Sequence, residues 1–100
     1  AIVAATENMP GGRATRPGDI VRAMNGKTIE VENTDAEGRL TLADAVSYAV
    51  REGADEIVDL ATLTGACVVA LGRGMSGLFC SDTSLESRLI ECGKASGDLL

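Results

Sequence analysis

Apolar residues between positions 42 and 49 repeat with the spacing of an α-helix. At i, i+3, i+4 and i+7 they would form one continuous stripe: Leu42, Ala45, Val46 and Ala49. Arg51 in the last turn and Gly53 just beyond it are typical of a helix end. Because a short amphipathic helix is stable only when its apolar face packs against another element, the neighbouring segments decide the fold.

Strand-like patterns stand on both sides of this helix. Apolar runs at 1–6 and 56–61 predict buried strands, and residues 77–81 predict another. A second helix is predicted from the capping-box pattern that begins at Thr83. Strands that alternate with helices predict an α/β fold, with a mixed sheet flanked by helices and at least part of the sheet parallel.

A β-hairpin is predicted directly before the first helix. Two strand-like runs, 20–24 and 28–31, flank the dipeptide Asn25-Gly26. Asn-Gly tolerates the positive φ angles that a type I′ turn requires at both central residues. The sequence therefore predicts a tight hairpin closed by a type I′ turn.

The chain of 100 residues has the composition of a globular protein, with 45% hydrophobic and 24% charged residues. That length suffices for one core, which must be built from aliphatic residues because Tyr48 and Phe79 are the only aromatic ones. The first residues look like a strand already under way. We therefore expect residues 1–100 to be a single partial domain, an internal piece of a larger one.

Charge and residue usage exclude several classes of protein. The net charge of −6, without a cluster of Lys and Arg, excludes a nucleic-acid binder, and no apolar run reaches the ~20 residues of a membrane span. Three widely spaced cysteines and no histidine exclude zinc fingers. The cysteines, each in an apolar setting, are expected to be reduced core thiols, which predicts a cytoplasmic protein.

The stretch "VENTDAEGRL", residues 31–40, places three charged residues on alternate positions: Asp35, Glu37 and Arg39. In an extended segment they would share one face, since side chains at i and i+2 point the same way. Two carboxylates could then hold or bridge divalent cations, and the arginine could neutralise them or bind an anion beside a metal. A polar turn with a local ion pair explains the same pattern, so both interpretations stay open at this point.

Two other motifs fail because their context is wrong. The residues from Asn33 to Asp44 mimic a calcium-binding loop, but a hairpin precedes them where that loop needs a helix. "GRGMSG", residues 72–77, has the spacing of a dinucleotide-binding loop, but "LFCS" follows where that loop needs a helix. Neither calcium nor nucleotide binding is expected.

"NTDAEGRL", residues 33–40, resembles the signature of the cytosolic leucyl aminopeptidase family, hexameric exopeptidases that use two metal ions. The flanking segments "ENMPGGRATRPGDIVRAMNGKTIEV" and "DLATLTGACVVALG" are similar to that family in the same order and spacing. The resemblance implies a partial catalytic domain of that α/β fold. It also implies peptide substrates with a leucine-like N-terminal residue and a homo-hexamer. That no nucleic-acid or membrane partner is expected follows from the charge and the apolar runs given above.

The resemblance also implies roles for single residues. Asp35 would bind one metal through its side chain and backbone carbonyl, and Glu37 would bridge both metals. The metals would be Mn²⁺ or Zn²⁺, and Mg²⁺ is also compatible with carboxylate ligands. Arg39 would be the catalytic arginine, which in this family holds a bicarbonate ion. Three residues of "TLTGA" would line the substrate cleft: Thr62, Leu63 and Gly65. The carbonyl of Leu63 and the amide of Gly65 would face the peptide.

The same family uses two lysines and two further aspartates that precede the segment present here. Lys27 and Lys94 are the only lysines of this chain, and neither stands in a matching context. We therefore expect residues 1–100 alone to hydrolyse nothing measurable. The alternative function is a non-catalytic α/β binding or scaffold module that keeps the segment without the activity.

Overall fold

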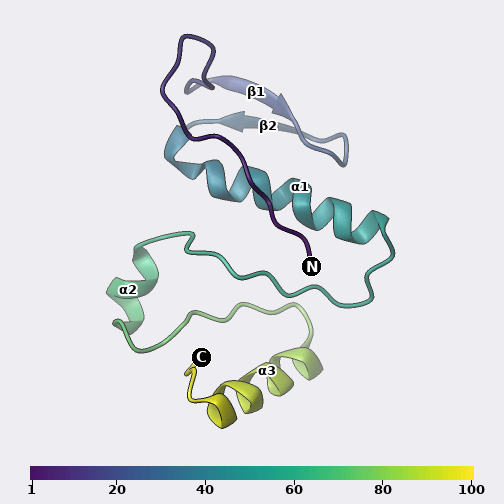
Figure 1. Ribbon diagram of the computed structural model, residues 1–100, viewed down its shortest axis with the longest axis vertical. Helices are drawn as coiled ribbons and strands as arrows, with labels where there is room; N and C mark the ends of the chain where they lie inside the picture. The colour runs from purple at the N-terminus through teal and green to yellow at the C-terminus, as the bar shows by residue number, and fades with distance from the viewer. The chain divides into compact units, whose positions relative to one another are not determined.

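A computed structural model describes all residues, 1–100, and the chain divides into two compact units, Ala1–Leu63 and Thr64–Leu100. The first regular structure of the first unit is a hairpin of two antiparallel strands, β1 (Asp19–Arg22) and β2 (Thr28–Val31). Figure 1 shows this hairpin beside the long helix of the same unit. The predicted hairpin is confirmed, and the expectation of one partial domain stays a prediction.

The turn of the hairpin differs from the predicted type I′. Gly26 has φ +85°, but no residue other than glycine has a positive φ, so Asn25 does not meet the type I′ requirement. The N–H of Gly26 donates to the carbonyl of Ala23 at 2.9 Å, and the N–H of Ala23 donates to the carbonyl of Lys27 at 2.8 Å. The residues between Ala23 and Lys27 therefore form a three-residue loop, in which Gly26 follows a tight turn. The predicted turn type was wrong because the dipeptide Asn-Gly suits this three-residue loop as well as a type I′ turn.

The predicted first helix is confirmed as α1 (Glu37–Arg51), which follows a short 3₁₀ turn, η1 (Thr34–Ala36). It ends as expected, with Gly53 in a left-handed conformation at φ +83°. Of the predicted apolar stripe, Ala49 is buried, whereas Val46 remains about one-third exposed. The stripe therefore lies where it was predicted, but the rest of the chain only partly covers it.

The expected strands at 1–6 and 56–61 are absent, and both segments run without ladder hydrogen bonds, as does 77–81. The sheet consists of β1 and β2 alone, and it is antiparallel. The predicted parallel pairing is therefore not found in these residues. A strand is defined by its partner, and an apolar run in the sequence does not show where that partner lies.

The second unit contains α2 (Ala66–Leu71) and α3 (Thr83–Ser96). Helix α3 was predicted, but its N-cap is Asp82 rather than Thr83, because the Asp82 carboxylate accepts the N–H of Leu85 at 2.7 Å. Glycines with a positive φ end both helices: Gly72 and Gly97. No helix begins at the end of "GRGMSG", which agrees with the rejection of a nucleotide-binding loop.

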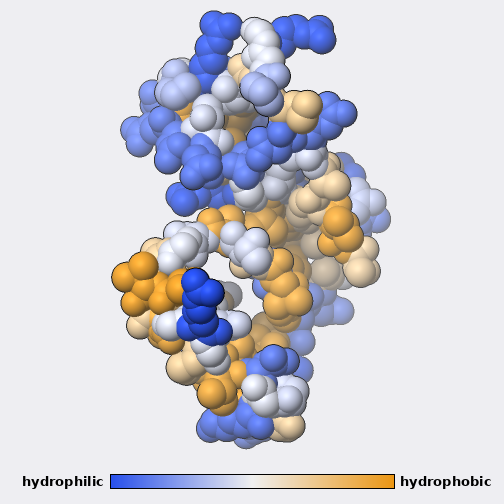
Figure 2. Space-filling view, turned by 60° about the vertical axis from the view of Figure 1, so that its left-hand side comes forward, coloured by the Kyte–Doolittle hydropathy of each residue, from blue (hydrophilic) through white to orange (hydrophobic).

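Few residues are enclosed by the chain, so the sizeable aliphatic core expected from its length is not found. The buried hydrophobic residues are Ala23, Val31 and Ala49. Figure 2 shows apolar side chains lying open on the surface.

The cysteines are unpaired as predicted, but Cys80 and Cys92 are exposed, so the expectation of core thiols was wrong for these two. None of the helices has the length and apolar character required to cross a membrane.

Candidate functional site

The acidic residues of the "NTDAEGRL" segment lie where the hairpin leads into α1. Asn33 has extended backbone angles, and its side-chain oxygen accepts the N–H of Asp35 at 3.0 Å. Its carbonyl accepts the N–H of Ala36 at 3.2 Å. Asparagine favours such local bonds, because its short side chain mimics a backbone turn. The chain therefore coils from Thr34 onward instead of continuing as a strand.

This coil overturns the prediction that three charged residues share one face of an extended segment. Asp35 lies in η1, whereas Glu37 and Arg39 lie in the first turn of α1. Two residues along a helix differ by about 200° in direction, so Glu37 and Arg39 project apart. No ion pair joins Arg39 to either carboxylate. The interpretation as a turn closed by a local ion pair is thus not supported.

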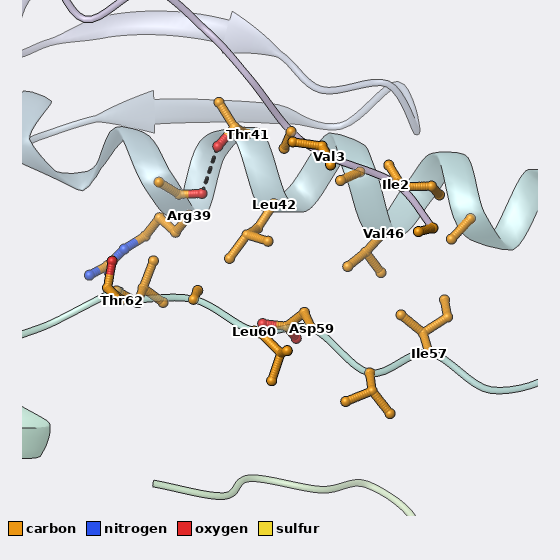
Figure 3. Close-up of a pocket in the computed structure, with 18 of the residues that line it drawn as sticks. Ile2, Val3, Arg39, Thr41, Leu42, Val46, Ile57, Asp59, Leu60 and Thr62 are labelled. Atoms are coloured by element: carbon orange, nitrogen blue, oxygen red, sulfur yellow. Dashed lines mark hydrogen bonds between the residues drawn. The ribbon is translucent and has the colours of Figure 1, made fainter. Parts of the chain in front are cut away.

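A cavity of about 770 Å³ nevertheless gathers most of the predicted site residues within the first unit. Its walls are the N-terminal segment, the first turns of α1 and residues 56–63 (Figure 3). Five of the six predicted residues line it: Asp35, Glu37, Arg39, Thr62 and Leu63. Its volume is in the usual range for a small-molecule site. In Figure 3 the Arg39 side chain extends toward the segment that carries Thr62.

Gly65 is the one predicted site residue that is not among those lining the cavity. It belongs to the second unit, where it is the N-cap of α2. A carbon atom added at its Cα would meet nothing within 4 Å, so the surroundings of Gly65 are open. Its predicted role in substrate binding therefore stays a prediction.

Apolar side chains form part of the cavity wall. Leu42 and Val46 point from α1 toward the segment that carries Ile57 and Leu60 (Figure 3). Asp59, which was not predicted as a site residue, also lines the cavity. The signal that could have identified it is an acidic residue inside an otherwise apolar run.

The hydroxyl of Thr41 donates to the carbonyl of Gly38 at 2.9 Å, beside the carboxylates. This bond lies in the first turns of α1, on the backbone that follows Glu37. Thr41 was also not predicted, because a threonine that bonds a carbonyl three residues earlier leaves no distinctive sequence pattern.

The donor atoms at the site fit part of a metal centre. Asp35 and Glu37 supply carboxylate oxygens, which suit Mg²⁺ and Mn²⁺ and are also used by Zn²⁺. No group of three or more potential metal-binding side chains occurs in the chain. These residues can therefore contribute ligands, but a complete centre requires further groups.

Comparison with known proteins connects this site to one family over the whole chain. The model of the "Cytosol aminopeptidase family, catalytic domain" matches residues 1–100. A "Probable cytosol aminopeptidase" of Cyanothece sp. is 62% identical over 99 residues, which is 99% of this chain and 20% of that protein. "Leucine aminopeptidase 1" of Arabidopsis thaliana is 60% identical over 99 residues and is covered to 19%.

A solved structure agrees with these sequence matches. A mutant of tomato leucine aminopeptidase superimposes with a TM-score of 0.93 and 57% sequence identity, over 96% of this chain and 19% of that one. The fold is therefore that of a partial α/β domain of the leucine aminopeptidase type, as predicted. The chain spans about a fifth of the length of the relatives it matches.

Proposed function

Because the chain belongs to the cytosol aminopeptidase family, we propose that the protein containing it removes leucine-like N-terminal residues from peptides by metal-dependent hydrolysis. The observation that carries this proposal is the cavity in which two carboxylates and an arginine meet residues of the "TLTGA" segment. The relatives named above support the general activity. The roles of single residues and the use of two metal ions are part of the proposal.

In this proposal Asp35 and Glu37 are ligands of two divalent metal ions, and the remaining ligands come from other parts of the protein. The ions, Mn²⁺ or Zn²⁺ with Mg²⁺ also compatible, would polarise the scissile carbonyl and lower the pKa of the attacking water. Asp35 is exposed and Glu37 is half-buried, so both carboxylates are accessible from the cavity. The Thr41–Gly38 hydrogen bond lies in the turn that follows Glu37.

Arg39 would hold an anion beside the reacting peptide bond. Its guanidinium has no ion-pair partner in the structure, and its side chain is exposed toward the cavity. A planar group with several N–H donors binds a flat, three-oxygen anion such as bicarbonate through paired hydrogen bonds. The same charge would stabilise negative charge that develops on the substrate carbonyl oxygen.

Residues of the "TLTGA" segment would bind the peptide. Thr62 and Leu63 line the cavity with exposed backbone outside any helix or strand, so their polar groups are available to a substrate. In the proposed arrangement the carbonyl of Leu63 and the amide of Gly65 bond the peptide backbone. Backbone contacts of this kind fix the position of a substrate without selecting its side chain.

The experiment is an assay of the full-length protein on leucine p-nitroanilide with Mn²⁺ or Zn²⁺. Glu37→Gln keeps the size of the side chain but removes its charge, and it should lower kcat/KM by roughly a thousandfold or more. Glu30→Gln, an exposed position on β2, is the matched control and should change little. An inactive wild-type protein would instead favour the alternative of a non-catalytic binding or scaffold module.

We further propose that the full-length protein is a homo-hexamer located in the cytoplasm. The hexamer is implied by the resemblance to the family. The cytoplasm is supported by the free cysteines and by the names of relatives such as "Probable cytosol aminopeptidase". Sedimentation of the purified full-length protein should give six times the mass of one chain, and a monomer or dimer would contradict the assembly.

A further inference from the structure

Gly38 is a glycine within the first turn of α1, where glycine is a poor choice for helix stability. Its φ is not positive, unlike those of Gly26 and Gly53, so backbone freedom does not explain its presence. It is not fully exposed either. The remaining explanation is space, because a residue without a side chain lets another group approach the helix.

The group that approaches Gly38 is the side chain of Leu63. A Cβ atom added at position 38 would lie 3.2 Å from Cδ1 of Leu63, whereas carbon atoms in contact normally stay 3.5–4.0 Å apart. The contrast with other glycines of this unit is clear, since an added Cβ at Gly11 or Gly12 would meet nothing within 4 Å. Only the absence of a side chain at 38 allows the present separation.

This contact lies between the two halves of the proposed site. Gly38 follows Glu37 directly and is three residues from Asp35, whereas Leu63 follows Thr62 on the opposite wall of the same cavity. We propose that Gly38 is a positioning residue, which sets how closely the Leu63 side chain, on the wall that carries the substrate-binding residues, approaches the helical turn that carries the carboxylates. This inference rests on the proposed function.

The expected effect on catalysis follows from the geometry. A methyl group at position 38 would displace the Cδ1 end of Leu63 by a few tenths of an ångström, and with it the part of the cavity wall against which the peptide would lie. Small misplacements of a bound substrate cost catalysis far more than they cost binding. Gly38→Ala should therefore lower kcat about tenfold with less than a threefold change in KM. The unfolding temperature should stay unchanged or rise, because alanine favours the helix.

The test compares four variants of the full-length protein with the wild type: Gly38→Ala, Leu63→Ala, the double variant, and Gly12→Ala as a matched control in open space. Leu63→Ala removes the Cδ1 atom, so it makes room for a methyl group at position 38. In the Leu63→Ala background the Gly38→Ala change should therefore reduce kcat by less than twofold. Thermal unfolding is measured for every variant as a readout independent of turnover.

The outcomes separate this inference from the proposed function. Loss of activity in Gly38→Ala that disappears in the Leu63→Ala background supports the positioning role, even if the methyl group also lowers the unfolding temperature. An active wild type with unchanged kcat in Gly38→Ala, or an equal loss in both backgrounds, overturns the positioning role alone. An inactive wild type, by contrast, overturns the proposed function and the inference together.

Discussion

Asn33 controls the point at which extended backbone becomes helical. Its side-chain oxygen accepts the N–H of Asp35, which would otherwise lack a partner at the start of η1. The proposed metal ligands therefore depend on a residue that does not itself line the cavity. This dependence can be tested by substitution.

Asn33→Ala in the full-length protein should weaken this turn by about 1 kcal/mol, since it removes a capping side chain. Asn33→Asp should keep the cap, because a carboxylate oxygen accepts the same bond. Thermal unfolding should show a midpoint lower by roughly 1–3 °C for the alanine variant and little change for the aspartate variant. Equal midpoints for all three proteins would show that the bond contributes nothing.

The residue scale also shows where sequence reasoning failed. Asp35, Glu37 and Arg39 all line the cavity, but their predicted common face assumed an extended chain. Asparagine at position 33 and glycine at 38 suit both a turn and a strand end, so local propensity did not decide between them. Asp59 was missed because its proximity to these residues is tertiary, and its one local signal, an acidic residue inside an apolar run, does not show which residues lie near it.

At the scale of elements, one hydrogen bond ties the hairpin to α1. The carboxylate of Asp44 accepts the N–H of Met24 at 2.7 Å, across 20 residues of sequence. Met24 lies in the turn between β1 and β2, where its N–H has no partner in the ladder. A helical side chain thus orients the end of the hairpin that is farthest from η1.

Asp44→Ala should loosen this end of the hairpin without changing the cavity, because Asp44 is not part of its lining. The loss of one bond to a charged, exposed acceptor is worth about 1 kcal/mol, which corresponds to about fivefold faster opening. Hydrogen exchange of the amides of residues 22–27 in the full-length protein measures this directly. Asp44→Asn retains an acceptor oxygen, so its amides should exchange as slowly as those of the wild type. Fast exchange in this variant would mean that the negative charge of Asp44, rather than the hydrogen bond alone, protects the turn.

Helix α3 depends on a glycine for a different reason. A Cβ atom added at Gly93 would lie 2.5 Å from the carbonyl oxygen of Asp98, a backbone atom that cannot rotate away. The chain folds back at Gly97, whose N–H donates to the carbonyl of Gly93 at 2.9 Å. The absence of a side chain at position 93 is therefore required for this turn.

Gly93→Ala should destabilise the full-length protein by about 1–3 kcal/mol, although alanine is the better helix former. Urea unfolding should show a lower midpoint for this variant. Glu91→Ala, at an exposed position of the same helix, is the control and should unfold near the wild-type midpoint. A higher midpoint for Gly93→Ala would mean that helix propensity outweighs the clash.

Elements with local signals were predicted well, and elements that need distant partners were not. The hairpin, α1 and α3 were found from turn, stripe and capping patterns, all of which act within a few residues. The strands expected at 1–6 and 56–61 were read from apolar runs alone. Such runs indicate burial, but the hydrogen-bonding partner that makes a strand lies far away in the sequence.

At the scale of the whole molecule, the chain leaves most of its apolar residues in contact with water. It exposes 8278 Å², whereas a compact protein of 10.3 kDa exposes about 5,400 Å². Leu60, Phe79 and Val69 are each about nine-tenths exposed. Exposed apolar surface of this extent normally contacts further protein. The relatives, which are about five times longer than this chain, contain the additional residues that could supply that contact.

Residues 1–100, purified alone, should therefore neither hydrolyse leucine p-nitroanilide nor unfold cooperatively. Few side chains are enclosed, so heating should give a gradual loss of structure, and a dye that binds apolar surface should fluoresce strongly in its presence. The full-length protein at equal molar concentration is the control and should show a sharp transition and weak dye fluorescence. Turnover by residues 1–100 that Glu37→Ala abolishes would refute this prediction. It would mean that Asp35, Glu37 and Arg39 suffice for catalysis without ligands from elsewhere, and the metal centre would then have to be reassigned within this chain.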